Sequence, residues 1–176
     1  MAGSRDALAD LRLALGSGEE MVVGPASEHD LVPLFEMFSD VVERKEGYPH
    51  APPLTPEVFD SVWSGPRTTV ICARLDQGGL AGAYYLRPNF PGRAAHIANA
   101  GYMVARVERG RGIGKLLVED SIRRAPALGF DAVQFNLVFE SNPARAMYES
   151  LGWREIGRVP RAVEGEDAIV YWRAVG

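Results

Sequence analysis

A glycine-rich segment with three cationic side chains is the part of this sequence best suited to bind an anionic ligand. Its residues are Arg109-Gly110-Arg111-Gly112-Ile113-Gly114-Lys115, and a helix is expected to follow. Glycines let the backbone approach a ligand closely and adopt positive φ angles. The N–H groups of the first helical turn and the helix dipole together form an anion site. The segment therefore predicts a phosphate or pyrophosphate ligand, although a turn that only caps the helix has the same composition.

Spacing excludes two common nucleotide-binding motifs from this segment. A P-loop requires a glycine five residues before its Gly-Lys pair and a hydroxyl residue directly after the lysine. Arg109 and Leu116 occupy those positions here. A dinucleotide-binding fingerprint requires a third glycine at position 117, where this chain has Leu117. A phosphate ligand of another class is therefore expected.

Amide side chains interrupt two segments that otherwise have the composition of buried strands. In residues 131–138, alternation places Gln134 and Asn136 on the face opposite the apolar side chains. Burying an amide without a partner costs roughly 1–3 kcal/mol. Asn136 therefore either belongs to a structural hydrogen-bond network or faces an active-site cleft, and we favour the cleft. Asn99, in residues 96–104, is a similar case.

Neither a metal site nor a disulfide is expected. The three histidines, His29, His50 and His96, do not have metal-ligand spacing with one another. Cys72 is the single cysteine, which excludes an internal disulfide and a cysteine-rich zinc site. His50 belongs to the proline-rich loop 47–56, where it can line the mouth of a cleft. No residue is assigned as a general base.

The elements that position these residues predict an α+β or mixed α/β layer fold. Helices are expected near residues 5–15, 30–38 and 57–63, and a short strand at 21–23. Antiparallel strands are expected at 68–74, 80–87 and 96–104. Alternating elements follow at 112–128 (helix), 131–138 (strand) and 142–151 (helix), with two strands after Trp153. Strands that lead into such βαβα alternation are typical of this fold class.

Composition narrows the function classes further. The chain has 176 residues, of which 47% are hydrophobic, and its formal net charge is −4. This length predicts a single domain at 21–176 after an N-terminal extension at 1–20. The acidic balance disfavours nucleic-acid binding. The sequence contains neither an apolar run that could span a membrane nor a signal peptide, so a cytoplasmic protein is expected.

Two motifs in this order resemble the GCN5-related N-acetyltransferases, the GNAT family. The spacing Arg109-x-x-Gly112-x-Gly114 is similar to the family's acetyl-CoA signature. The stretch from Asn142 through Tyr148 to Trp153 is similar to its asparagine–tyrosine–glycine–aromatic signature. The resemblance covers about residues 21–174. It implies a mixed, mostly antiparallel central sheet flanked by helices, with a parallel splayed strand pair.

The resemblance also implies acetyl-CoA as co-substrate, with no metal. Backbone amides of the glycine-rich segment would hold the pyrophosphate, and the strand around Val104 and Arg106 would pair with the pantetheine. Asn142 would contact the CoA arm, or serve as a helix N-cap, and the two roles are compatible. The pyrophosphate-binding residues would be Arg109, Gly110, Arg111, Gly112, Ile113, Gly114 and Lys115.

Tyr148 matches the family tyrosine near the cofactor sulfur, which implies a general acid; the alternative is a core aromatic. The segments around Asn99, Asn136 and Asn142 look like a subgroup that includes the yeast acetyltransferase acting on the proline analogue azetidine-2-carboxylate. In that subgroup, Asn99 and Asn136 would hold the carboxylate and position the amine of a small substrate.

Acetyl transfer to a small amine, an amino or imino acid, by direct attack in a ternary complex is therefore the leading hypothesis. One alternative is acetylation of protein N-termini or lysines, which requires an open polypeptide groove. The other is a catalytically silent acyl-CoA-binding sensor. Homodimers are common among similar proteins, so the resemblance allows a homodimer here.

Overall fold

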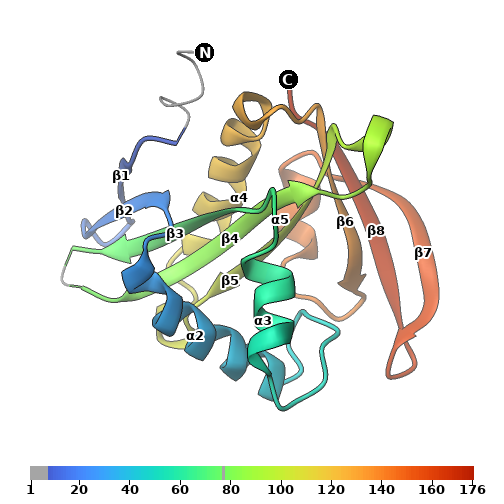
Figure 1. The fold of residues 1–176 in the computed structure, drawn as a ribbon, viewed down its shortest axis with the longest axis horizontal. Helices are drawn as coiled ribbons and strands as arrows, with labels where there is room; N and C mark the ends of the chain where they lie inside the picture. Colours follow the sequence, from blue (N-terminus) through green and yellow to red (C-terminus); the bar gives the residue numbers. More distant parts are fainter. Residues whose placement is uncertain (1–7, 77) are drawn as a thin grey trace.

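Eight strands form one mostly antiparallel sheet with helices on both of its faces (Figure 1). The computed structural model describes residues 8–76 and 78–176, and these statements refer to that part of the chain. The strands are β1 (Leu11–Ala14), β2 (Glu20–Pro25), β3 (Thr69–Leu75), β4 (Leu80–Pro88), β5 (Ile97–Val104), β6 (Ala132–Phe139), β7 (Arg154–Val163) and β8 (Glu166–Ala174). The helices are α2 (Leu31–Glu43), α3 (Pro56–Trp63), α4 (Ile113–Arg124) and α5 (Arg145–Ser150).

Strand order places the β5–β6 pair inside the sheet. The order is β1-β2-β3-β4-β5-β6-β8-β7, and β5 and β6 are the parallel neighbours among the described strands. They pair only from Ile97–Ala132 to Asn99–Gln134, after which the two strands diverge. The predicted fold class is confirmed, including the splayed parallel pair.

The two faces of the sheet bury separate apolar clusters. Leu117 of α4 and Tyr148 of α5 pack with one face, whereas Phe38 of α2 and Trp63 of α3 pack with the other. The buried residues of α2 recur at helical spacing, which is why this segment forms an amphipathic helix. Fully burying one such side chain contributes roughly 1.5–3 kcal/mol. No described helix has the length and apolar character needed to cross a membrane.

The expected helix at residues 5–15 is wrong over Leu11–Ala14, which form β1. Leu11 and Leu13 are half-buried while their neighbours are exposed, a two-residue period, and the strand pairs with β2. Strand pairing therefore overrides the local helix propensity. Residues 5–7 lie outside the described part. The boundary expected at residue 20 falls within this hairpin, and the proposed division of the chain there stays a prediction.

Two predicted helices are shorter than expected. The segment 112–128 forms α4 only as far as Arg124, and a 3-10 helix over Pro126–Leu128 follows. Proline has no N–H to donate within a helix, which accounts for the end of α4. The segment 142–151 forms α5 over Arg145–Ser150. The other predicted elements are confirmed to within a few residues.

Candidate active site

A cavity of about 770 Å³ opens where β5 and β6 diverge. The loop between α2 and α3 forms one of its sides, and β4, β5, β6, residues 141–143 and Tyr148 of α5 contribute others. The predicted site residues that line it are Asn99, Val104, Arg109, Asn136, Asn142 and Tyr148. The other predicted residues do not line this cavity; they are Arg106, Gly110, Arg111, Gly112, Ile113, Gly114 and Lys115. The structure therefore separates the predicted residues into a cavity group and a loop group.

The edge of β5 that faces the cavity carries accessible backbone polar groups. Beyond Asn99, β5 has no ladder with β6. The carbonyl of Tyr102 accepts a hydrogen bond from Tyr48 Oη (3.3 Å), and the Val104 carbonyl accepts one from Arg109 Nε (3.4 Å). Because both donor side chains line the cavity, this edge faces the open space. A ligand with amide groups can pair with such an edge as an added strand does.

The glycine-rich loop presents the N-terminus of α4 without a side-chain cap. Gly110 and Gly112 have φ angles of 77° and 84°, which residues with a Cβ rarely adopt. Gly112 is the N-cap position, and no side chain caps the helix that begins at Ile113. The first N–H groups of a helix have no acceptor within the helix. This turn can therefore donate several backbone hydrogen bonds to an anion.

Each cation of the loop already faces a carboxylate. Arg109 Nη2 lies 2.7 Å from Glu46 Oε2, in the loop that follows α2. Arg111 is paired with Glu19 and Glu108, and Lys115 Nζ lies 3.8 Å from Glu119 Oε1. The loop thus adds less positive charge than its composition indicates, which leaves its backbone amides as the donors best placed for an anion.

Tyr148 lies at the wall of the cavity. Its side chain is 8% exposed, and its ring packs 4.9 Å from Phe135 between ring centroids. Within the described chain, its hydroxyl makes no hydrogen bond. Burial, followed by the neighbouring Tyr171, raises the pKa of Tyr148 to about 12. The phenol therefore remains protonated at neutral pH.

Asn99 and Asn136 each take part in a structural hydrogen-bond network and also face the cavity, the two interpretations that the sequence left open. Asn99 accepts from Tyr85 Oη (3.1 Å) and donates to the Gln134 carbonyl (3.0 Å). Asn136 exchanges two hydrogen bonds with Asn89, at 3.1 and 2.7 Å, and accepts a third from Gln134 Nε2. Both side chains also line the cavity. Each amide NH₂ has two hydrogens, and these contacts use one of them.

Asn142 lies between the cavity and α5. Its Oδ1 accepts from the Ala144 N–H at 2.9 Å. Ala144, not Asn142, is the N-cap residue of α5. The expected capping position is therefore wrong by two residues, although the side chain does satisfy a backbone N–H just before the helix. Asn142 also lines the cavity.

Sequence reasoning missed two cavity residues on β4, Tyr85 and Arg87. A cation within an otherwise apolar strand is the same signal that singled out Asn136, so Arg87 could have been found. His50 lines the cavity, as its place in the proline-rich loop predicts. Burial lowers the pKa of His50, and the charge of Arg87 lowers it further. His50 is therefore neutral at neutral pH.

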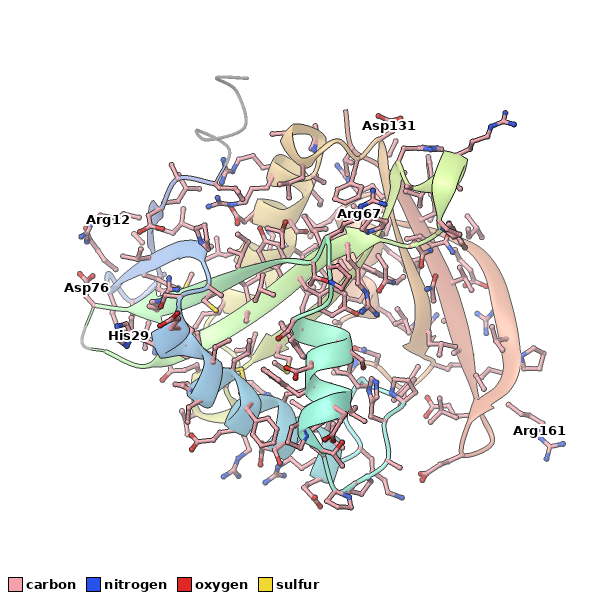
Figure 2. The ribbon with its side chains drawn as sticks, in the orientation of Figure 1. Arg12, His29, Arg67, Asp76, Asp131 and Arg161 are labelled. Atoms are coloured by element: carbon pink, nitrogen blue, oxygen red, sulfur yellow. The ribbon has the colours of Figure 1, made fainter. Side chains whose placement is uncertain are left out.

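The histidines do not gather around a metal. His29 lies in the 3-10 helix Glu28–Asp30 just before α2 (Figure 2), whereas His50 lies in the loop before α3. Within residues 8–76 and 78–176, no three His, Cys, Asp or Glu side chains are placed to hold a metal ion. Cys72 is buried, and burial raises the pKa of its thiol to about 12.

Comparisons with known proteins agree with this geometry. Residues 34–153 match the model of the acetyltransferase (GNAT) family. A stretch of 101 residues is 36% identical to the N-acetyltransferase aca1 of Schizosaccharomyces pombe, and it covers 56% of this chain and 48% of aca1. The chain therefore spans about half the length of that relative.

Solved structures extend the likeness over nearly the whole chain. A GCN5-related N-acetyltransferase from Kribbella flavida has a TM-score of 0.81 and 37% identity, over 88% of this chain and 97% of that one. A phosphinothricin acetyltransferase from Sinorhizobium meliloti, solved in complex with acetyl-CoA, has a TM-score of 0.77 and 21% identity, over 89% of each chain. The second likeness concerns the fold alone. Together with the family model, the first shows that this chain belongs to the acetyltransferase (GNAT) family.

Proposed function

We propose that this chain transfers an acetyl group from acetyl-CoA to the nitrogen of a small amine, an amino or imino acid, by direct attack in a ternary complex. One observation carries the proposal. The cavity at the β5–β6 divergence is bordered by an unpaired strand edge, by a protonated tyrosine and by two amide side chains. These are the groups that thioester aminolysis uses.

The residues present fit acetyl-CoA. The CoA arm contains amide groups that can pair with the free edge of β5 near Val104 and Arg106. Asn142 lies at the cavity wall, where it would contact this arm. The pyrophosphate of acetyl-CoA would bind at the uncapped N-terminus of α4 and the loop from Arg109 to Lys115. Gly110 and Gly112 hold that loop in a conformation that other residues would strain.

Tyr148 supports the departure of the thiolate. In the proposed step, the neutral amine nitrogen forms a bond to the thioester carbonyl carbon, and the C–S bond then breaks. The sulfur leaves as a thiolate and takes the Tyr148 proton, while the amine loses a proton to water, and the Tyr148 phenolate then takes a proton back from water. A phenol with a pKa of about 12 is protonated when the step begins. General-acid help of this kind contributes typically 10²–10⁴-fold to a rate.

The loop after α2 lines one side of the cavity, which favours a small acceptor over a polypeptide. Tyr48, Pro49 and His50 place this loop at the wall of the cavity. Asn99 and Asn136 line the same space and each retain an unused amide hydrogen. These donors suit an acceptor that has a carboxylate beside its amine, which is also the substrate class that the azetidine-2-carboxylate subgroup implies.

A panel of acceptors tests the proposal through CoA thiol release from acetyl-CoA. The panel contains azetidine-2-carboxylate, 4-hydroxyproline, common amino acids, polyamines and N-terminal peptides. We expect turnover with a cyclic imino or amino acid, and its loss in Asn136→Ala while acetyl-CoA still binds. Turnover with peptides alone would favour a protein acetyltransferase. Tight acetyl-CoA binding without turnover of any acceptor would favour a sensor.

A further inference from the structure

The cavity contains one positive charge that no carboxylate balances. Lys45 Nζ lies 2.6 Å from Glu164 Oε1, and Arg109 is paired with Glu46 at the cofactor end. In the described part of the chain, no Asp or Glu forms an ion pair with Arg87. A cation without a counter-ion in a cavity that is partly shielded from water attracts an anionic ligand more strongly than a fully exposed cation does.

Three contacts fix the place of Arg87. It lies on β4 directly opposite Asn99 on β5, so the two side chains are neighbours on one face of the sheet. Its guanidinium lies 5.0 Å from the ring centroid of Tyr85, and its Nη1 donates to the Ser61 carbonyl of α3 at 2.7 Å. These contacts use one of the five guanidinium N–H donors and orient the group beforehand.

Tyr85 connects this cation to the amides across the cavity. Its hydroxyl donates to Asn99 Oδ1, and its ring packs against Trp63 with centroids 5.3 Å apart. Asn99, held in this way, lies on β5, the strand that pairs with β6. Asn136 on β6 also lines the cavity. Arg87 thus lies at the β4 end of a row of polar side chains that lines the proposed acceptor site.

From this row we infer that Arg87 binds the carboxylate of the acceptor and restricts the acceptors to small amino and imino acids. The inference rests on the proposed function and deepens it. A guanidinium can hold a carboxylate through two parallel hydrogen bonds, which sets its orientation as well as its position. With the carboxylate on Arg87 and Asn99, an amine on the adjacent carbon is directed toward the diverging strands, where Tyr148 lines the wall.

A matched pair of acceptors tests the inference. Azetidine-2-carboxylate and azetidine present the same ring amine with and without the carboxylate, and thiol release gives kcat and KM for each. For Arg87→Gln we expect KM for azetidine-2-carboxylate to rise about ten- to hundred-fold, the range for hydrogen bonds to charged groups. The kinetic parameters for azetidine should remain within about two-fold. Arg87→Lys keeps the charge but loses the planar fork, so an intermediate KM is expected.

Controls separate binding from folding. Arg161 lies on β7, and its side chain projects away from the molecule (Figure 2). Arg161→Gln therefore removes the same charge without touching the cavity and should leave both acceptors unchanged. The melting temperature and the affinity for acetyl-CoA are measured for every variant. If Arg87→Gln does not fold, the KM ratio of the two acceptors in Arg87→Lys decides the question.

Each outcome has a distinct meaning. If Arg87→Gln weakens both acceptors equally, or wild type prefers azetidine, the role of Arg87 is refuted while a small-amine acetyltransferase stands. If wild type turns over neither these acceptors nor any amino acid but does acetylate peptides, the proposed function itself is refuted. A selective rise in KM for azetidine-2-carboxylate alone establishes the carboxylate contact.

Discussion

Replacement of Tyr148 by phenylalanine separates catalysis from stability more cleanly than other single changes at this site. The hydroxyl makes no hydrogen bond within the described chain, and its ring packs with Phe135, Trp153 and Tyr171. Phenylalanine keeps those ring contacts and removes only the phenolic oxygen. No partner is left unsatisfied, so the free energy of unfolding should change by less than about 0.5 kcal/mol.

The expected loss in activity is far larger. If Tyr148 supplies the proton to the thiolate, Tyr148→Phe should lower kcat about 10²–10⁴-fold, equivalent to about 3–5 kcal/mol of transition-state stabilisation. The dissociation constant for acetyl-CoA should not change. Because burial raises the pKa of Tyr148 to about 12, wild-type activity should not fall through ionisation of this residue below about pH 10.

The assay is thiol release at saturating acetyl-CoA between pH 6 and pH 10, with calorimetric titration of acetyl-CoA alongside. Tyr84→Phe is the matched control, because that buried hydroxyl donates to Asp120 Oδ2 at 2.7 Å. It should lower stability by about 1–3 kcal/mol and leave kcat nearly unchanged. A kcat within about threefold of wild type for Tyr148→Phe would refute the general-acid role. An alkaline fall near pH 9 that disappears in this variant would refute the pKa reasoning.

Two further predictions concern ion pairs. Glu46→Gln removes the carboxylate that pairs with Arg109 and leaves this cation available to the cofactor. In calorimetric titration, the dissociation constant for acetyl-CoA should therefore fall by up to about fivefold, which is the range for an exposed ion pair. Weaker binding would contradict this prediction. Burial opposes ionisation of Asp30, but hydrogen bonds led by Arg74 outweigh it and lower the pKa from 3.8 to about 2. This carboxylate therefore contributes about 2 kcal/mol of stability above pH 4 that is lost as the pH falls toward 2. In urea unfolding, Asp30→Asn should cost about that much at pH 7 and much less near pH 2.5, and an equal cost at both would exclude the linkage.

Local patterns predicted most of the elements because each has a strong period of its own. The helix α2 and the strands β3 to β6 follow from apolar spacing and from the turn at Gly78 and Gly79. The strand β1 could not be predicted in this way, since its leucines fit either period and only pairing with β2 decides between them. The place where the β5–β6 ladder ends, which creates the cavity, depends on register between distant segments.

The sequence predicts which residue types form the candidate site. It does not predict which of the charged residues are paired with an opposite charge. The sequence identifies Arg109 and Arg111 as cations near a phosphate. Their partners Glu46 and Glu19 lie 63 and 92 residues away along the chain, where no local pattern connects them. Folding thus pairs the cations that the composition emphasises with carboxylates. It leaves Arg87 on β4 as a cavity-lining cation that makes no ion pair with the described residues. The distribution of charge inside the cavity is therefore a property of the tertiary structure.

The position of the glycine-rich turn, the proposed anion site, depends on the opposite end of its helix. Near the C-terminus of α4, Arg124 is 1% exposed and its Nε lies 2.8 Å from Asp120 Oδ2, which also accepts from Tyr84 on β4. Arg124 Nη2 donates to the carbonyls of Ala9 and Val23, at 3.1 and 3.0 Å. A buried ion pair gains little net stability, but it requires one arrangement in which its donors are satisfied. These bonds fix α4 to β2 and β4 by its C-terminal half, so its uncapped first turn is held in place before an anion binds.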